Sequence, residues 1–67
     1  MEKKIGTANW MAEAYPDLVR GNDYIIESFI MGKVYVYDLE GNYVAIARAD
    51  CFDNYRALNG RYIILDE

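Results

Sequence analysis

The sequence predicts a small α+β domain built on an antiparallel meander of about four strands, with a short N-terminal helix and a short helix before the last strand. Three observations predict it: side chains alternate from Met31 to Ala47, turn residues stand at Gly32-Lys33 and at Asp38–Asn42, and a short helical pattern flanks that stretch on each side. The whole chain, residues 1–67, fits one compact domain. A small bent β-barrel is the alternative, because it hides both faces of its strands by curling.

The first element we expect is a short helix over Ala8–Ala14. Thr7 can cap it, and Trp10 and Met11 fall on its apolar side. Pro16 ends it, since proline disfavours the α conformation in the residue before it. A helix of two turns is not stable alone, so Trp10 and Met11 are expected to dock on one face of the sheet.

A first strand is expected over Tyr24–Met31, followed by a tight turn at Gly32-Lys33. Such a turn sets Met31 opposite Val34. The same register sets two acidic residues, Glu27 and Asp38, opposite each other. This is mildly unfavourable and is evidence against the register at that end of the strands.

The next two strands form a hairpin around Asp38–Asn42, where Gly41 supplies the positive φ of a type I turn with a bulge. Setting Asp38 opposite Asn42 pairs Tyr37 with Tyr43. Side chains alternate along a strand, so the hairpin has two faces. The aliphatic face contains Val34, Val36, Val44 and Ile46, joined by Ile25, Phe29 and Met31 of the first strand. The tyrosine face contains Tyr35, Tyr37, Tyr43, Ala45 and Ala47, joined by Tyr24, Ile26, Ser28 and Ile30.

The second helix is expected to begin at Asp50, with Asp53 in its first turn and Tyr55 on its apolar side. Asn59-Gly60 is a strong helix stop. Arg61–Leu65 then reads as the last strand, because it is too apolar to be a tail.

Charge and composition exclude several functions. The net charge of −4 argues against binding phosphate backbones and is compatible with a partner that has a basic surface. With no His and one Cys, a single chain can build neither a zinc site nor a disulfide. We expect Cys51 to be a small buried residue rather than a nucleophile, and the Asp38–Asn42 turn lacks the ligands of a calcium loop. The sequence therefore predicts no enzyme, no metal and no cofactor.

The N-terminal residues show no signal peptide, and no apolar stretch is long enough to span a bilayer. The expected compartment is the cytoplasm, with no membrane association.

The tyrosine face is the one constellation that suggests a function, because both faces of the predicted sheet are apolar and something must cover this one. The helices could cover it as core. A stacking platform for single-stranded nucleic acid is an alternative, as is a structural role in a larger assembly. We expect an interface, since Tyr is enriched at contact centres. The function predicted is stoichiometric protein binding with self-association into a homodimer, and inhibition of a nucleic-acid-processing enzyme is one form of it.

The residues expected to make the contact fall into two sets. The centre is expected to contain Tyr24, Ile30, Tyr35, Tyr37 and Tyr43. The acidic side chains expected to steer a basic partner are those of Asp38, Glu40, Asp50 and Asp53.

Overall fold

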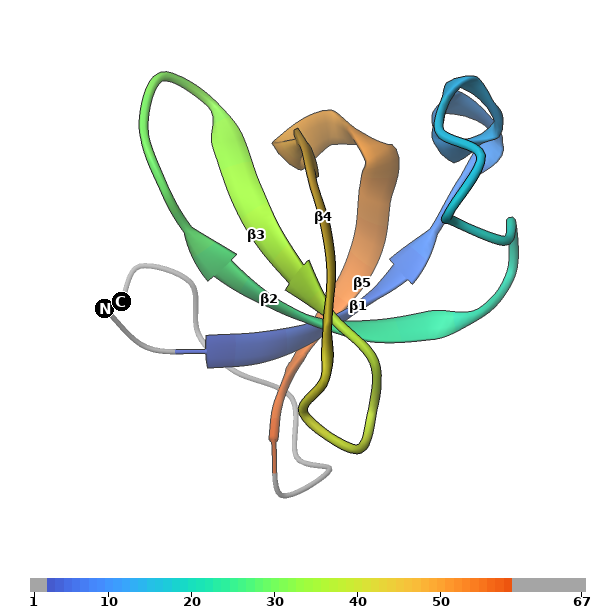
Figure 1. Cartoon of the computed structure of the whole chain (residues 1–67). Coiled ribbons are helices and arrows are strands. Elements are labelled where there is room, and N and C mark those ends of the chain that lie inside the picture. The colour runs from blue at the N-terminus through green and yellow to red at the C-terminus, as the bar shows by residue number, and fades with distance from the viewer. Residues whose placement is uncertain (1–2, 59–67) are drawn as a thin grey trace.

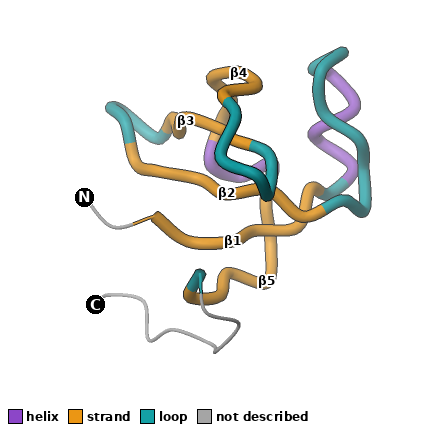
Figure 2. The backbone as a smooth tube through the Cα atoms, turned by 60° about the horizontal axis from the view of Figure 1, so that its bottom comes forward, coloured by secondary structure: helices purple, strands orange, loops and turns teal. Residues whose placement is uncertain are grey.

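The computed structural model describes residues 3–58, which form a five-stranded antiparallel sheet (Figure 1). The strands are β1 (Lys3–Ala8), β2 (Asp23–Ser28), β3 (Lys33–Tyr37), β4 (Tyr43–Arg48) and β5 (Phe52–Ala57). Their order in the sheet is β4-β3-β2-β1-β5, which Figure 2 shows as a stack with β4 at one end and β5 at the other. The antiparallel meander is confirmed. The sheet is not closed into a barrel, because β4 and β5 do not pair over the described residues.

The predicted N-terminal helix is wrong in its start and its type. Ala8 belongs to β1, and the helical segment is a single 3-10 helix, η1 (Trp10–Ala14). Its cap is Asn9, whose side-chain oxygen accepts a hydrogen bond from the Met11 N–H at 2.9 Å. Asn caps a helix as well as Thr does. Thr7 lies in β1 instead, where its hydroxyl donates to Asp23 Oδ1 at 2.6 Å.

The predicted second helix is also wrong. Only Ala49–Cys51 are helical, as the 3-10 helix η2, and Phe52–Ala57 extend as β5 beside β1. Gly6 makes this approach possible, since a Cβ at that position would lie 3.0 Å from Cβ of Phe52. Burial of Phe52 against the sheet thus overrides the local helical pattern. The predicted stop at 59–60 and the last strand at 61–65 lie outside the described residues.

The pairing of β2 with β3 differs from the predicted register by three residues. Val34 lies opposite Ser28 rather than Met31, and the loop between the strands spans residues 29–32. Met31 and Gly32 both have positive φ in this loop, at 54° and 77°. With this longer loop Glu27 lies opposite Tyr35, so the unfavourable pairing of Glu27 with Asp38 expected from the sequence does not occur.

An odd shift in register exchanges the two faces of a strand, and β2 shows this consequence. Tyr24 and Ile26 point into the core, where Ile26 lies opposite Val36. Ile25 points to the other face, opposite Tyr37. The predicted faces of β2 are therefore reversed.

The hairpin between β3 and β4 confirms the predicted turn. Gly41 has a φ of 92°, its N–H donates to the Asp38 carbonyl at 2.9 Å, and Tyr37 lies opposite Tyr43. A bulge follows at once, so that Val36 pairs with Ala45 instead of Val44. Beyond the bulge the predicted faces of β4 are reversed. Ala47 is buried beside Val34, and Ile46 points outward beside Tyr35.

The core lies on the inner face of the curved sheet, closed by the long connection between β1 and β2 that carries η1. Tyr24 packs its ring edge-on against Phe52, with centroids 6.1 Å apart, and its hydroxyl accepts the Val19 N–H at 2.9 Å. The buried residues are Ala8, Ala12, Leu18, Tyr24, Ile26, Val34, Val36, Ala47, Cys51 and Phe52.

Candidate functional site

The opposite face of the sheet carries a second apolar surface, which we call the outer face. It consists of Ile5, Ile25, Tyr35, Tyr37, Tyr43 and Ile46. Strand register places four of these side chains in one row across four strands, running Ile5, Ile25, Tyr37, Tyr43. Within residues 3–58 the two 3-10 helices contact each other, and Ala12 of η1 and Cys51 of η2 belong to the core on the inner face. Tyr43 is 59% exposed and Ile46 38%, whereas the other four residues of this face are partly buried.

Contacts within the outer face hold its rings in fixed positions. Tyr37 and Tyr43 meet edge to face, with centroids 6.1 Å apart and planes at 76°. The ring of Phe29, from the β2–β3 loop, lies 4.6 Å from that of Tyr35. Lys3 places its Nζ 4.8 Å above the Tyr37 ring. Each of the three tyrosine rings of the outer face therefore packs against at least one other described side chain.

Tyr37 is the most constrained of the three tyrosines. Its hydroxyl donates to Glu27 Oε1 at 3.3 Å. Removal from water raises the pKa of the Tyr37 hydroxyl, and the negative charge of Glu27 raises it further. Tyr37 therefore stays neutral and contributes a ring and a neutral hydroxyl to the surface.

Of the five residues expected at the centre of the contact, the structure brings three together and separates the other two. Tyr35, Tyr37 and Tyr43 share the outer face. Tyr24 lies in the core, so its predicted place on the tyrosine face is wrong. Ile30 lies exposed in the β2–β3 loop rather than on a strand face.

The sequence reasoning missed Ile5, Ile25 and Ile46 as members of this surface. Ile5 was missed because no strand was predicted over residues 3–8, where Thr7 was expected to cap a helix. Ile25 and Ile46 were assigned to the opposite face, because the loop length and the bulge that reverse their strands leave little local signal.

The acidic side chains predicted to steer a partner are mostly engaged in holding loops. Asp38 accepts the Glu40 N–H and the Asn42 N–H, each at 2.9 Å, and these bonds hold the pKa of its carboxyl below the ordinary value. Asp53 accepts from Asn9 Nδ2 at 3.2 Å. Asp50 pairs with Arg48 at 2.9 Å, and this pairing lowers the pKa of Asp50. Only Glu40 makes no side-chain hydrogen bond to another described residue.

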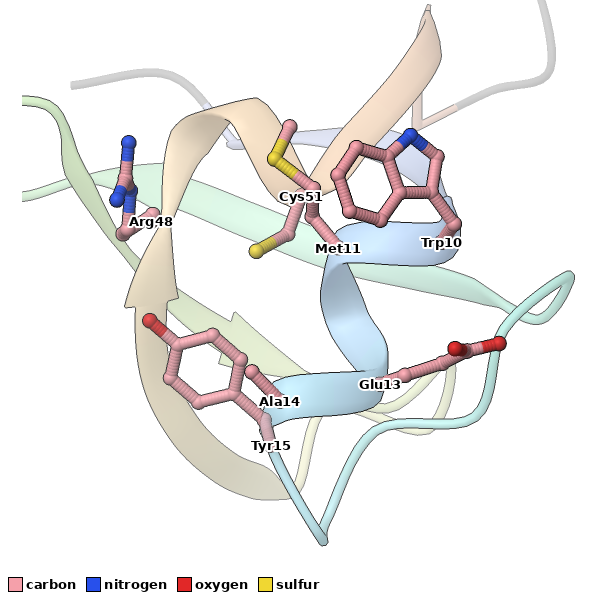
Figure 3. A pocket seen from close by; sticks show the side chains of 7 residues that line it. All are labelled: Trp10, Met11, Glu13, Ala14, Tyr15, Arg48 and Cys51. Atoms are coloured by element: carbon pink, nitrogen blue, oxygen red, sulfur yellow. The ribbon is translucent and has the colours of Figure 1, made fainter.

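A second apolar feature is a hollow of about 470 Å³ between η1 and η2 (Figure 3). Its apolar walls come from Trp10, Met11, Tyr15 and Cys51, and Glu13 and Arg48 stand at its edge. Trp10 is 62% exposed here, so the expectation that it docks on the sheet is wrong. Both charged groups are already paired, Glu13 with Arg20 and Arg48 with Asp50.

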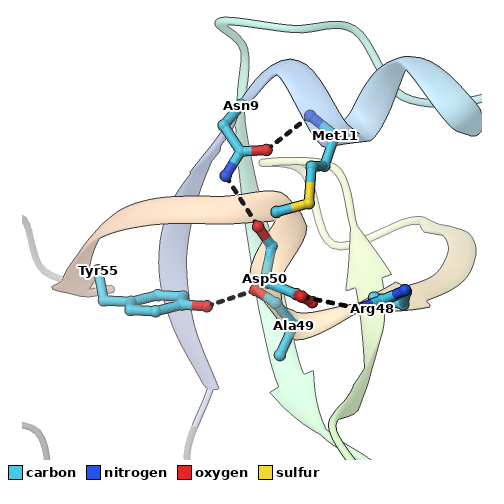
Figure 4. Close-up of polar contacts among 6 residues, drawn as sticks. All are labelled: Asn9, Met11, Arg48, Ala49, Asp50 and Tyr55. Carbon is cyan, nitrogen blue, oxygen red and sulfur yellow. Dashed lines mark hydrogen bonds and ion pairs between the residues drawn. The ribbon is translucent and has the colours of Figure 1, made fainter.

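Hydrogen bonds between segments far apart in sequence fix the position of η2 beside this hollow (Figure 4). Asn9 Nδ2 donates to the Asp50 carbonyl at 2.9 Å, and the Tyr55 hydroxyl donates to the Ala49 carbonyl at 2.9 Å. Asn9 thus caps η1 and ties it to η2 at the same time.

Cys51 lies beneath the hollow and is buried, as the sequence predicted. Burial raises the pKa of its thiol, which opposes nucleophilic chemistry. Among residues 3–58, no three His, Cys, Asp or Glu side chains gather in a group suited to a metal ion. Over the same residues, no helix has the length and apolar character needed to cross a bilayer.

Comparison of the chain with protein-family models, curated proteins and solved structures gives no match.

Proposed function

We propose that this protein is a non-catalytic binding module that contacts another protein, in fixed stoichiometry, through the outer face of its sheet. The observation that supports the proposal is the row Ile5, Ile25, Tyr37, Tyr43, which crosses four strands on the face of the sheet opposite the buried core. A continuous apolar surface on a small domain is typical of an interaction site. Tyrosines bury much area with few rotatable bonds, which favours their use in contacts.

Charge favours a protein over a nucleic acid as the partner. A stacking platform for single strands needs free cations beside its rings. Of the cations on this side of the sheet, Arg48 is paired with Asp50 and Arg56 with Asp23, each at 2.9 Å. This leaves only Lys33 of β3 without an ion pair or ring contact among the described residues. Lys3 lies over the Tyr37 ring, where a base would have to stack.

The net charge of −4 suits a partner with a basic surface, and an enzyme that normally holds DNA or RNA is one such partner. In that case raising the salt concentration should slow association and leave dissociation nearly unchanged. Excess nucleic acid should displace the partner, and failure to compete counts against this narrower form of the proposal.

The experiment that tests the proposal compares capture of partner proteins from source-cell extract by three immobilised chains. They are the wild type, the outer-face variant Tyr43→Ser/Ile46→Ser, and a control variant Trp10→Ser in the hollow. The substituted side chains are all exposed, so each chain should fold, which circular dichroism checks. Trp10→Ser removes an exposed aromatic side chain from a different surface.

The proposal predicts a protein retained in stoichiometric amount by the wild type and by Trp10→Ser, and lost from the outer-face variant. Retention by the folded outer-face variant together with loss from Trp10→Ser contradicts it, and moves the contact to the hollow between η1 and η2.

A further inference from the structure

The outer edge of β4 carries backbone groups that no other described strand satisfies. β4 forms one end of the sheet and pairs only with β3 over residues 3–58 (Figure 2). A strand edge of this kind is a template for a further strand, since each free N–H and C=O can join a new ladder.

The phase of the ladder between β3 and β4 identifies which groups are free. The Ala49 N–H donates to the Gly32 carbonyl at 2.7 Å. In an antiparallel pair, residues alternate between directing their backbone groups toward the partner and away from it. Ala47 and Ala45 therefore direct theirs at β3, and Ile46 directs its N–H and C=O outward.

The middle of the β4 edge, Ala45–Ala47, lacks the devices that usually protect an edge strand. Natural edges carry charged residues, proline or distortions that block pairing. The run Tyr43–Ala47 has neither charge nor proline, and its bulge lies at the Tyr43 end, so Ala45–Arg48 is regular. At the opposite edge, β5 carries Asp53 and Arg56, and Asn54 has a φ of 56°.

We propose that two copies of this chain pair through their β4 edges, antiparallel, about a two-fold axis at Ile46. The Ile46 N–H then donates to the carbonyl of the partner's Ile46, and the reverse bond completes a symmetric pair. In this register Ala45 faces the partner's Ala47, so small side chains meet on the inner side. No carboxylate lies on the strand itself, so none faces the two-fold axis directly.

The pairing joins two five-stranded sheets into one. Residues directly opposite each other in a ladder point to the same side of the sheet. The two Ile46 side chains therefore meet, and the outer faces of both copies become one surface. A contact made by one short strand edge buries less surface area than a stable dimer interface does. The dimer therefore forms reversibly and depends on protein concentration.

The pairing uses the β4 backbone, whereas the proposed function uses side chains of the whole outer face, so either can fail without the other. The test substitutes Ile46 with opposite charges in two separate chains, Ile46→Lys and Ile46→Glu. Like charges placed directly opposite each other in a ladder repel, and opposite charges attract. A control variant, Ile5→Thr, alters the outer face on β1, well away from the β4 edge.

The absolute mass of each sample is measured by light scattering over a wide concentration range. We expect the wild type and Ile5→Thr to pass from one chain to two. Each charged variant alone should remain a folded monomer, with a dissociation constant raised at least about tenfold. An equal mixture of Ile46→Lys and Ile46→Glu should recover the dimer. A wild type that is monomeric up to about 1 mM, where even weak pairing shows, or a mixture of folded variants that does not associate, overturns the proposal.

Hydrogen exchange in the unmodified protein gives a second readout. The Ile46 amide should exchange slowly at high concentration and quickly in dilute solution. Protection that is equally strong in dilute solution would mean that the chain itself covers this edge, and overturns pairing with a second copy.

Discussion

Tyr37 and Tyr43 lie directly opposite each other, edge to face, at the last position of the β3–β4 hairpin before its bulge. The turn at Asp38–Asn42 sets this pair, and the bulge after it decides which side chains of β4 join the tyrosines. The pair therefore marks the point where local turn chemistry stops determining the register and packing of the core begins to do so.

Replacing Gly6 with Ala should destabilise the fold, because the new Cβ would lie 3.0 Å from Cβ of Phe52 and 3.2 Å from the Tyr55 ring. Phe52 is buried and its Cβ is fixed to the backbone of β5, so the two strands must move apart. We expect a loss of about 1–3 kcal/mol in the free energy of unfolding. Urea unfolding measures it, and a stability equal to that of the wild type would contradict the close approach of β1 and β5.

The Asp38 carboxylate should stabilise the turn only when ionised. Its pKa is lowered by hydrogen bonds from the Asn42 and Glu40 backbones, so its contribution is complete above the unfolded pKa of about 3.9. The contribution is lost as the pH falls through the lower folded pKa. The difference in unfolding free energy between wild type and Asp38→Asn should therefore shrink from pH 6 to pH 2. Glu40→Gln is the control, since it removes the same charge from the same turn without a hydrogen bond, and an equal pH dependence there would refute this account.

Replacing Glu27 with Gln should lower the pKa of the Tyr37 hydroxyl toward its ordinary value. Burial raises this pKa first and Glu27 adds to it, so part of the shift should remain in the variant. Because the folded protein raises the pKa of Tyr37, the neutral hydroxyl stabilises the fold. This contribution to the free energy of unfolding is complete below the unfolded pKa of about 10, and it is lost as the pH rises through the folded pKa. NMR titration of the Tyr37 ring carbons measures both effects. An unchanged pKa would show that Glu27 does not contact Tyr37 in solution.

The thiol of Cys51 should be nearly inert in the folded protein. It is buried at the base of the hollow, and burial raises its pKa, so thiolate forms only after local opening. Its reaction with a thiol reagent at pH 8 should be at least about 100-fold slower than in urea, which corresponds to an opening cost of roughly 3 kcal/mol. Equal rates in the two conditions would place Cys51 at the surface.

The sequence predicts most accurately where the structure depends on adjacent residues. The turn at Asp38–Asn42 and the pairing of Tyr37 with Tyr43 follow from one glycine and a spacing of a few residues. Alternation identifies β2, β3 and β4, and Tyr35, Tyr37 and Tyr43 share a face as predicted, but β1 and β5 were not predicted as strands.

The errors arise where distant segments decide the outcome. Val34 pairs with Ser28 because the buried positions of β2 match those of β3, which the turn residues at 32–33 do not reveal. Phe52 enters a strand because Gly6, more than forty residues earlier, leaves room for it. Tertiary packing overrides local propensity at both places.

The central proposal is that the outer face, whose Tyr43 and Ile46 are exposed over residues 3–58, is the surface that contacts a partner. The most direct measurement is the relaxation that a soluble paramagnetic probe induces in side-chain NMR signals of the wild type at low concentration. We expect strong enhancement at Tyr43 and Ile46, comparable to that at Trp10, and almost none at the buried Val36. Enhancement at Tyr43 and Ile46 as weak as that at Val36 would show that the chain covers its own outer face, and would contradict the proposal.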